Sequence, residues 1–404
     1  MTTVPHSLCL ALDGARFGPR AAALTPAWLW VHQGMVKHLA AYPPAALPPD
    51  TVHLQGGWAV EPLADAHVHL FLCGAFSKEE RAATASLDRD GALQRILDLL
   101  ADYRGRGIAA VRDGGDPHGL ALEAAEVANR HPDRYAAVRP SGEPVFRRGL
   151  YGGFLGAGVE TPREAARLLE RNRRRGATQA KLLATGLNSL DRPGQVGPTQ
   201  FGPNELREIT AAARALELPT MVHANGPLGT VLSSAPTSVE HGFWAEPQDL
   251  AALAGQGIAW VPTVGAWARL AAHPGLTPAQ RQVVAATDRR HREAIAVGFR
   301  LGVRLTAGSD AGTPGVRHGA GLLEEIERLA AAGLGRAAAL ATATYHARGL
   351  CRGSADRALG GLARGGPGGF LWLTADPVAD PQALSSPRGV FLGGEWSSQG
   401  NARG

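Results

Sequence analysis

The chain has 404 residues, of which 45% are hydrophobic and 19% charged, and its 41 Lys and Arg against 36 Asp and Glu give a formal net charge of +5. This composition excludes a disordered, collagenous or coiled-coil protein, and the length allows one large domain or several smaller ones. Only three of the 41 basic residues are lysines, at Lys37, Lys78 and Lys181, so a lysine in this chain is an uncommon choice.

The start of the chain lacks the basic segment and the apolar run of about 7–15 residues that a signal peptide needs. No stretch approaches about 18 uninterrupted apolar residues. Cys9, Cys73 and Cys351 lie far apart without a CxxC pair, which argues against disulfides and thiolate zinc sites. The one dense basic run, 171–175, ends a predicted helix, where cations are favoured. We therefore expect a cytoplasmic protein that binds neither membranes nor nucleic acid.

Short β-rich runs broken by Gly and Pro occupy both ends of the chain, at residues 28–62 and 361–398. Neither run is long enough to fold well alone. We expect them to assemble into one small β-sandwich domain built from both chain ends, residues 1–61 and 350–404.

Residues 62–349 alternate short apolar strands with helical stretches, the pattern of a parallel α/β sheet. Thr161 and Thr277 each precede a Pro and an acidic or amide residue, as helix starts do. Eight strands are the number that closes a (β/α)8 TIM barrel, so we predict this fold for the segment. The predicted strands are residues 63–70, 107–112, 135–140, 178–183, 218–223, 237–241, 258–264 and 303–310.

The first predicted barrel strand carries the sequence Asp65-Ala66-His67-Val68-His69-Leu70. Residues i and i+2 of a strand face the same side, so His67 and His69 can share one metal ion. Two alternate histidines also occur in packed polar cores, and the pair alone does not decide between these readings.

Four other predicted strands end in a group suited to a divalent metal: Lys181 on the fourth, His223 on the fifth, His241 on the sixth and Asp310 on the eighth. Strand ends of a parallel barrel surround one mouth, so these residues should converge. Taken singly, the histidines could be hydrogen-bonded core residues and Asp310 a helix cap. A buried lysine costs free energy unless it is paired, neutralised or able to snorkel. The joint pattern favours a metal centre.

This set of residues resembles the binuclear members of the amidohydrolase superfamily, and the resemblance covers most of the chain. Three flanking sequences are most similar to the imidazolonepropionase-related branch, which includes metal-dependent prolidases and other Xaa-amino-acid dipeptidases. They are Val111-Arg112-Asp113-Gly114-Gly115, Ser238-Val239-Glu240-His241-Gly242 and Gly308-Ser309-Asp310-Ala311-Gly312.

The resemblance implies two divalent metal ions, with Zn²⁺ the metal that such ligands favour, although manganese, iron or cobalt would also fit. A carbamate formed from CO2 on Lys181 would bridge the ions, which an arginine could not do. His67, His69 and Asp310 would hold the more buried ion, and His223 with His241 the more exposed one. A shared hydroxide would attack the substrate, with Asp310 as the acid and base.

Substrate contacts are expected from the loops. Relatives of the dipeptidase type present a carbonyl-polarising histidine in a Gly-Gly-His context, where this chain has Phe154. Tyr151 could donate to the carbonyl instead, and Arg147 or Arg148 could clamp a carboxylate or simply face solvent. Two further candidate contacts are Asn225 and His318. His318 could instead have a structural role and order its loop without contacting the substrate.

These features predict hydrolysis of an amide bond, in a dipeptide or an N-acyl amino acid. The same centre could attack a lactone, carbamate or phosphotriester. Deamination is disfavoured because no carboxylate follows His223 within a few residues, and a non-catalytic scaffold is disfavoured because all six ligand positions are filled. The partner would be a small-molecule substrate, and a homo-oligomer stays open because relatives are often oligomers.

Overall fold

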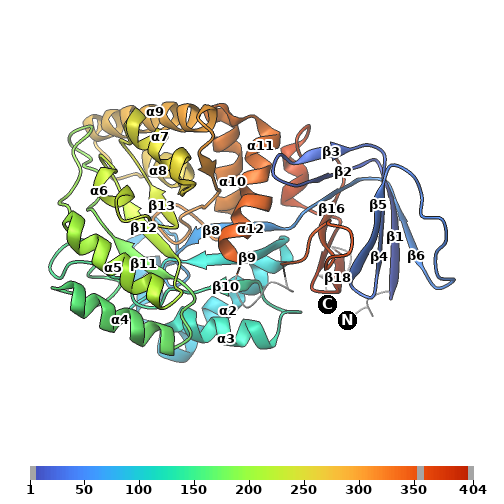
Figure 1. The fold of residues 1–404 in the computed structure, drawn as a ribbon, viewed down its shortest axis with the longest axis horizontal. Coiled ribbons are helices and arrows are strands. Elements are labelled where there is room, and N and C mark those ends of the chain that lie inside the picture. Colours follow the sequence, from blue (N-terminus) through green and yellow to red (C-terminus); the bar gives the residue numbers. More distant parts are fainter. Residues whose placement is uncertain (1–5, 353–358, 399–404) are drawn as a thin grey trace.

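The structure, a computed structural model, describes residues 6–352 and 359–398. It has two parts (Figure 1). The larger contains parallel strands with helices around them, and the smaller contains short strands from both ends of the chain. No described helix is both long and apolar enough to cross a membrane.

Eight parallel strands form two sheets in the larger part, with the orders β10-β9-β8 and β11-β12-β13-β14-β15. In the second sheet, Lys181 pairs with Met221 and His223 with Glu240, so the carboxyl ends of neighbouring strands lie side by side. The strands are β8 (Leu63–Val68), β9 (Ile108–Asp113), β10 (Ala137–Arg139), β11 (Ala180–Leu183), β12 (Thr220–Ala224), β13 (Ser238–His241), β14 (Ala259–Val261) and β15 (Arg304–Leu305).

Backbone hydrogen bonds also connect the two sheets at their outer edges. Beyond β10 the Val145 amide donates to the Lys181 carbonyl at 2.8 Å. Beyond β15 the Asp310 amide donates to the His67 carbonyl, also at 2.8 Å. The main chain therefore fixes Asp310 beside His67, and it joins Lys181 to the segment that follows β10.

Every predicted barrel strand is confirmed as a strand, though several are shorter than expected. The last differs most, because only Arg304–Leu305 pairs regularly with its neighbour and the chain then bends toward β8. The seventh ends at Val261, since Thr263 has a left-handed φ of 49° and a helix begins at Val264.

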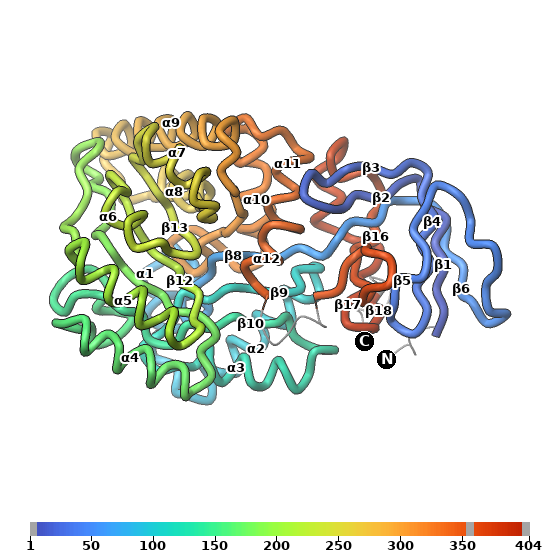
Figure 2. Tube along the Cα trace, in the orientation of Figure 1, coloured from blue at the N-terminus to red at the C-terminus, as the bar shows by residue number. Residues whose placement is uncertain are grey.

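Helices surround the parallel strands (Figures 1 and 2). The predicted starts at Thr161 and Thr277 are confirmed, because each hydroxyl accepts the amide hydrogen of the residue three positions later. The helices are α1 (Lys78–Ala85), α2 (Arg89–Gly105), α3 (Leu120–Arg130), α4 (Pro162–Arg174), α5 (Pro203–Ala215), α6 (Gly229–Leu232), α7 (Pro247–Gln256), α8 (Val264–Ala271), α9 (Pro278–Arg300), α10 (Ala320–Leu329), η1 (Ala330–Leu334), α11 (Arg336–Ala341), η2 (Thr342–His346), α12 (Ala347–Cys351) and, in the smaller part, η3 (Pro381–Ser385).

The smaller part has two sheets, with the orders β5-β4-β1-β6 and β18-β17-β16-β7-β2-β3. The second joins three strands from the end of the chain to three from its start, as the sequence predicted. Of the predicted ranges, residues 1–5, 353–358 and 399–404 lie outside the described residues. The strands are β1 (Ser7–Leu12), β2 (Gly14–Phe17), β3 (Ala22–Leu24), β4 (Ala27–His32), β5 (Met35–Ala40), β6 (Val52–Gln55), β7 (Trp58–Val60), β16 (Gly369–Leu373), β17 (Gly389–Leu392) and β18 (Glu395–Ser398).

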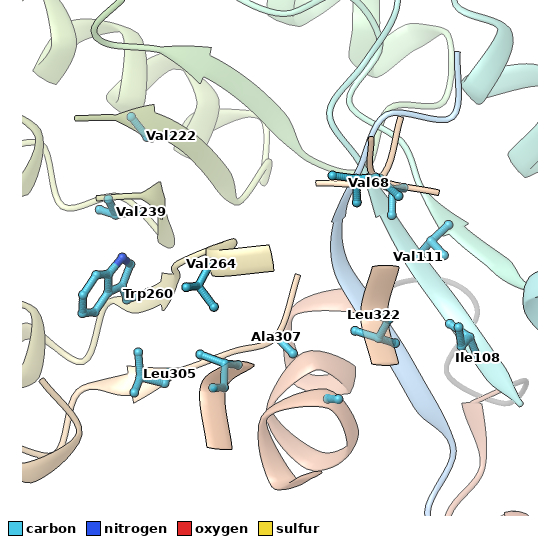
Figure 3. Close-up of a cluster of buried hydrophobic side chains, with 14 of the residues drawn as sticks. Val68, Ile108, Val111, Val222, Val239, Trp260, Val264, Leu305, Ala307 and Leu322 are labelled. Carbon is cyan, nitrogen blue, oxygen red and sulfur yellow. The ribbon is translucent and has the colours of Figure 1, made fainter. Parts of the chain in front are cut away.

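Apolar side chains from the parallel strands pack against the helices and form the main core (Figure 3). Val222, Val239 and Leu322 are examples, and none of the three is measurably exposed. Side chains alternate along a strand, so the strand residues next to these valines face the other way. A second apolar cluster, which includes Leu10, Leu29 and Phe370, contains side chains of both sheets of the smaller part.

Candidate metal centre

The six side chains predicted as metal ligands lie close together at the carboxyl ends of the parallel strands. The Lys181 Nζ atom lies 3.1 Å from the His67 Nε2 atom. Ring centroids are 5.0 Å apart for His67 and His241, and 4.6 Å apart for His223 and His241. The predicted convergence therefore holds for residues up to 243 positions apart in the chain, as His67 and Asp310 are.

The Asp310 carboxylate faces His67 in β8 and His69, which directly follows β8. Its Oδ1 atom lies 3.5 Å from the Nε2 atoms of His67 and His69, and this buried oxygen has no hydrogen-bond partner among the described residues. Asp310 has a left-handed φ of 57°, a conformation that a non-glycine residue adopts only when its surroundings hold it there. Asp65 stabilises this backbone conformation, because its carboxylate accepts hydrogen bonds from the amide and hydroxyl of Ser309 at 2.8 and 2.5 Å.

His241 reaches the cluster through a local change of backbone direction. In a regular strand, Glu240 and His241 would face opposite sides. His241 has a φ of 65°, and its ring lies near both His67 and His223. Its Nδ1 atom lies 2.8 Å from the Thr263 hydroxyl, which leaves Nε2 available as a ligand atom.

Burial controls the charge of these groups. Desolvation lowers the pKa of His223 to about 3 and the pKa values of His67, His69 and His241 well below the ordinary range, with Lys181 adding repulsion. Burial also lowers the pKa of Lys181 to about 8 and raises that of Asp310 to about 7. The four imidazoles are therefore neutral near pH 7, which is the form that binds metals.

The residues fit a divalent metal on this evidence. Among the described residues, one ligand atom each from His67, His69 and Asp310 lies within 4.8 Å of the other two, and all three residues are buried. The unpartnered Asp310 Oδ1 atom faces two imidazole nitrogens, as a carboxylate does when a cation can lie between them. Neutral histidines with a carboxylate are a ligand set typical of zinc and related metals.

Glu240 is a buried part of this site that was not predicted from the sequence. Its Oε2 atom accepts a hydrogen bond from His67 Nδ1 at 2.9 Å, and its other oxygen pairs with Arg112, which also donates to Ser238. The bond fixes the His67 tautomer, so that Nε2 points toward Lys181 and Asp310. The available signal was an acidic residue inside a predicted barrel strand, directly before the predicted ligand His241.

The cluster forms part of the wall of a cavity of about 370 Å³. This volume is within the range of about 300–1,000 Å³ that is common for small-molecule sites. Its wall combines the cluster with mainly apolar residues: His69, Leu72, Tyr151, Phe154, Leu155, Lys181, Leu183, Leu187, Asn188, Leu190, His223, Asn225, His241, Phe243, Thr263, Ala266, Trp267, Leu270, Asp310, Thr313 and Pro314.

Two of the predicted substrate contacts line this cavity. The Tyr151 ring lies 5.4 Å from the His223 ring between centroids, and burial raises the pKa of its hydroxyl, so the group is a neutral donor. The Asn225 side chain also lines the cavity, and its buried Oδ1 atom has no partner among the described residues. Phe154, which occupies the position of the expected histidine, lies 5.8 Å from Tyr151 between ring centroids.

The other three predicted contacts lie elsewhere. Arg147 pairs with Glu205 at 2.6 Å and stacks on Phe201, and Arg148 pairs with Glu160 and Glu164 on the surface. Neither guanidinium lines the cavity, because the carboxylates of neighbouring segments bind both.

His318 does not line the cavity either. Its Nδ1 atom lies 3.0 Å from the Tyr103 hydroxyl, and its Nε2 atom lies 2.9 Å from the Leu72 carbonyl. Both nitrogens are used within the protein, so its position corresponds to the alternative role of ordering a loop.

No protein-family model matches the chain. An uncharacterized protein of Mycobacterium tuberculosis (strain ATCC 25618 / H37Rv) is 27% identical over 383 residues, which cover 91% of this chain and 90% of that protein. An uncharacterized protein of Mycobacterium bovis (strain ATCC BAA-935 / AF2122/97) matches to the same extent.

Several solved structures have the same fold. A Xaa-Pro dipeptidase with methionine bound in its active site has a TM-score of 0.83 at 18% identity, covering 97% of this chain and all of that one. A. niger ochratoxinase has a TM-score of 0.79 at 19% identity, covering 96% and 95% of the two chains. Molinate hydrolase has a TM-score of 0.79 at 16% identity, covering 99% and 96%.

These proteins are hydrolases of the amidohydrolase superfamily. The chain therefore has the fold of this superfamily, and a prolidase-like protein is among the structures that share it. At the level of the fold, this confirms the predicted resemblance.

Proposed function

We propose that this protein is a metal-dependent hydrolase that cleaves an amide bond. The observation that carries the proposal is the convergence of His67, His69, Lys181, His223, His241 and Asp310 on the wall or beside the wall of one cavity. The fold shared with a Xaa-Pro dipeptidase supports the same class of reaction.

The architecture in this proposal is a closed (β/α)8 barrel over residues 62–349, with a β-sandwich built from residues 1–61 and 350–404. The hydrogen bonds that join β8 to the segment after β15, and Val145 to β11, support closure. The apolar cluster common to the two smaller sheets supports the sandwich.

His67, His69 and Asp310 would hold one divalent ion, and His223 and His241 the other. The Lys181 amine would react with CO2, release a proton and become a carbamate that binds both. When bound, such ions polarise a carbonyl group and lower the pKa of a water molecule. Zinc is the metal that best suits this histidine-rich set.

The chain's own residues would do the remaining work. The Asp310 carboxylate would accept a proton from the attacking water and return it to the leaving nitrogen. The Tyr151 hydroxyl, neutral and facing the cavity, would donate a hydrogen bond to the carbonyl oxygen as charge develops there. This donor would take the place of the histidine that Phe154 replaces.

The test is a substrate panel on zinc-loaded protein that contains dipeptides, N-acyl amino acids and uncharged amides, with lactones, carbamates and phosphotriesters as the second arm. We expect amide turnover that disappears after the metal is removed with a chelator and returns when zinc is added. Turnover confined to the second arm would reject amide hydrolysis. Loss of metal without loss of turnover would reject the metal mechanism.

A further inference from the structure

The cavity wall offers very little to a charged substrate. Its ionisable side chains are His69, Lys181, His223, His241 and Asp310, all from the candidate metal centre, together with the neutral Tyr151. The other polar groups are uncharged: Asn188, Asn225, Thr263 and Thr313. No arginine, and no acid other than Asp310, lines the cavity among the residues that the structure describes.

Three arginines close in sequence to the wall cannot serve as a carboxylate clamp where they stand, because each binds a carboxylate of the protein itself. Arg147 and Arg148 follow each other in the loop that leads to Tyr151, and both pair with carboxylates of the protein itself. Arg269, on the same helix as the wall residues Trp267 and Leu270, pairs with Glu324 at 2.5 Å. Each guanidinium therefore already has a charged partner away from the cavity.

A dipeptide carries a free ammonium group and a free carboxylate, and an N-acyl amino acid carries the carboxylate. A carboxylate that enters this cavity would lose hydration and find no dedicated partner, which is costly. Sites that select carboxylates usually present an arginine fork to them. Among the described residues, no arginine lines this wall.

The same wall suits an apolar substrate. Eleven of its 21 residues are Leu, Phe, Trp, Ala or Pro. Two of them, Phe154 and Leu187, are 49% and 54% exposed, so their apolar side chains are accessible to a ligand at the wall. Burial of apolar surface would provide most of the binding free energy, and the few neutral polar groups would orient the ligand.

We propose that the substrate is an uncharged, predominantly apolar amide, in which neither the acyl portion nor the amine portion carries an ionised group. An anilide or an N-arylalkyl amide has this chemistry. The inference rests on the proposed amide hydrolysis, and it departs from the dipeptide or N-acyl amino acid that the sequence predicted.

A matched pair of amides tests this proposal on zinc-loaded protein. N-benzoylphenylalanine and N-(2-phenylethyl)benzamide share the scissile bond and both rings, and differ only in the carboxylate. We expect kcat/KM to be at least about tenfold higher for the uncharged amide. An equal or higher value for N-benzoylphenylalanine would overturn the proposal.

A binding measurement separates this inference from the proposed function. The ligands are the two ketones in which a methylene group replaces the scissile N–H of each amide, and isothermal titration calorimetry gives their Kd values. We expect the uncharged ketone to bind at least about tenfold more tightly. If no amide of the substrate panel is hydrolysed but this difference holds, amide hydrolysis fails and the preference for uncharged ligands stands. Ketones that bind equally, or not at all, would overturn the preference.

Adding a cation to the cavity provides the reciprocal test. Leu187 lines the cavity and is half exposed, so Leu187→Arg should fold and place a guanidinium at the wall. We expect the ratio of kcat/KM between the uncharged and the carboxylate amide to fall by about tenfold. Leu301→Arg is the matched control, because Leu301 is 47% exposed and lies at the end of α9 outside the cavity wall. An unchanged ratio in Leu187→Arg would contradict the inference.

Discussion

The Glu240 carboxylate accepts a hydrogen bond from His67 Nδ1 at 2.9 Å, and neither side chain is exposed to solvent. The other oxygen of Glu240 pairs with the buried Arg112 guanidinium. Arg112 also donates to the Ala66 carbonyl at 2.8 Å, next to His67 in the chain. Glu240 therefore compensates a buried charge and directs the other nitrogen of His67 into the candidate metal centre.

Replacing this carboxylate should weaken the metal site. Glu240→Gln keeps the size of the side chain but removes its negative charge. The amide has one acceptor oxygen, so it cannot accept hydrogen bonds from His67 and Arg112 on two oxygens as the carboxylate does. We expect metal affinity or kcat/KM to fall by about 10–100-fold, the usual effect of changing the partner of a metal-binding histidine. Metal content by mass spectrometry and a zinc competition titration would measure this.

The control is Glu126→Gln, since the side chain of Glu126 is 73% exposed and pairs with Arg130 alone among the described residues. The melting temperature of both variants is needed, because Arg112 loses a charged partner in Glu240→Gln and this destabilises the fold. Unchanged zinc affinity in Glu240→Gln would show that Glu240 does not orient His67.

The ligand candidates could be predicted because strand geometry makes their positions regular. His67 and His69 share a face by the two-residue period, and Lys181 and His223 lie at the ends of neighbouring strands. Glu240 was missed for the same reason. Regular strand alternation places Glu240 and His241 on opposite faces, and the left-handed φ of His241 allows both to contribute.

The loop residues were harder to predict. No period relates Arg147 or Arg148 to the site, and their final positions depend on ion pairs with Glu205, Glu160 and Glu164, which lie 12 to 58 positions away in the chain. Tyr151 and Asn225 were placed near the site because they closely follow strand or motif residues, and both line the cavity.

Lys181 provides the test of the carbamate. In Lys181→Ala the bridging ligand is lost, and in Lys181→Arg the positive charge stays but no carbamate can form. We predict two metal ions per chain for the wild type. We expect the metal content of both variants to fall sharply below this value. A carbamate signal in the ¹³C NMR spectrum after incubation with labelled bicarbonate should be present in the wild type alone.

Lys78→Ala is the matched control, because Lys78 begins α1 and is exposed. Full metal content and full activity in Lys181→Ala would reject the carbamate, and so would a wild-type spectrum without the signal.

Asp310→Asn tests the acid and base role. The amide keeps the shape of the side chain and can still accept one hydrogen bond, but it cannot take up the proton of the attacking water. We expect folded protein whose kcat falls by about 10²–10⁴-fold, the usual contribution of proton transfer. Metal content must be measured beside kcat, because Asp310 is also a candidate ligand. A variant with near-normal turnover would remove Asp310 from this role.

Tyr151→Phe tests the donor to the carbonyl oxygen. The substitution removes only the hydroxyl and keeps the ring contacts with Phe154 and His223. If the hydroxyl donates in the transition state, its removal should lower kcat by about 100-fold and leave KM nearly unchanged. Tyr135→Phe, outside the cavity wall, is the control. If KM rises while kcat stays the same, Tyr151 contributes to substrate binding only.

Glu325 should make the stability of the protein depend on pH. This carboxyl group is fully buried and accepts hydrogen bonds from the amides of Val264 and Gly265 at the start of α8. Burial is the larger effect, and it raises the pKa from the ordinary 4.5 to about 8. The folded protein therefore keeps a proton on Glu325 that the unfolded chain releases above about pH 4.5.

Because the folded state binds the extra proton, this contribution to the free energy of unfolding is complete below about pH 4.5 and is lost as the pH rises toward about 8. In Glu325→Gln nothing titrates at this position, so the melting temperature should decline less between pH 5 and pH 8 than in the wild type. The variant should be less stable at pH 5, where one amide at the start of α8 loses its acceptor, and the gap should narrow at pH 8. Glu327 is an exposed residue of α10, the helix that also contains Glu325, and Glu327→Gln should follow the wild-type profile. Parallel profiles for the wild type and Glu325→Gln would show that Glu325 is ionised in the folded protein, held as a carboxylate by the two amides.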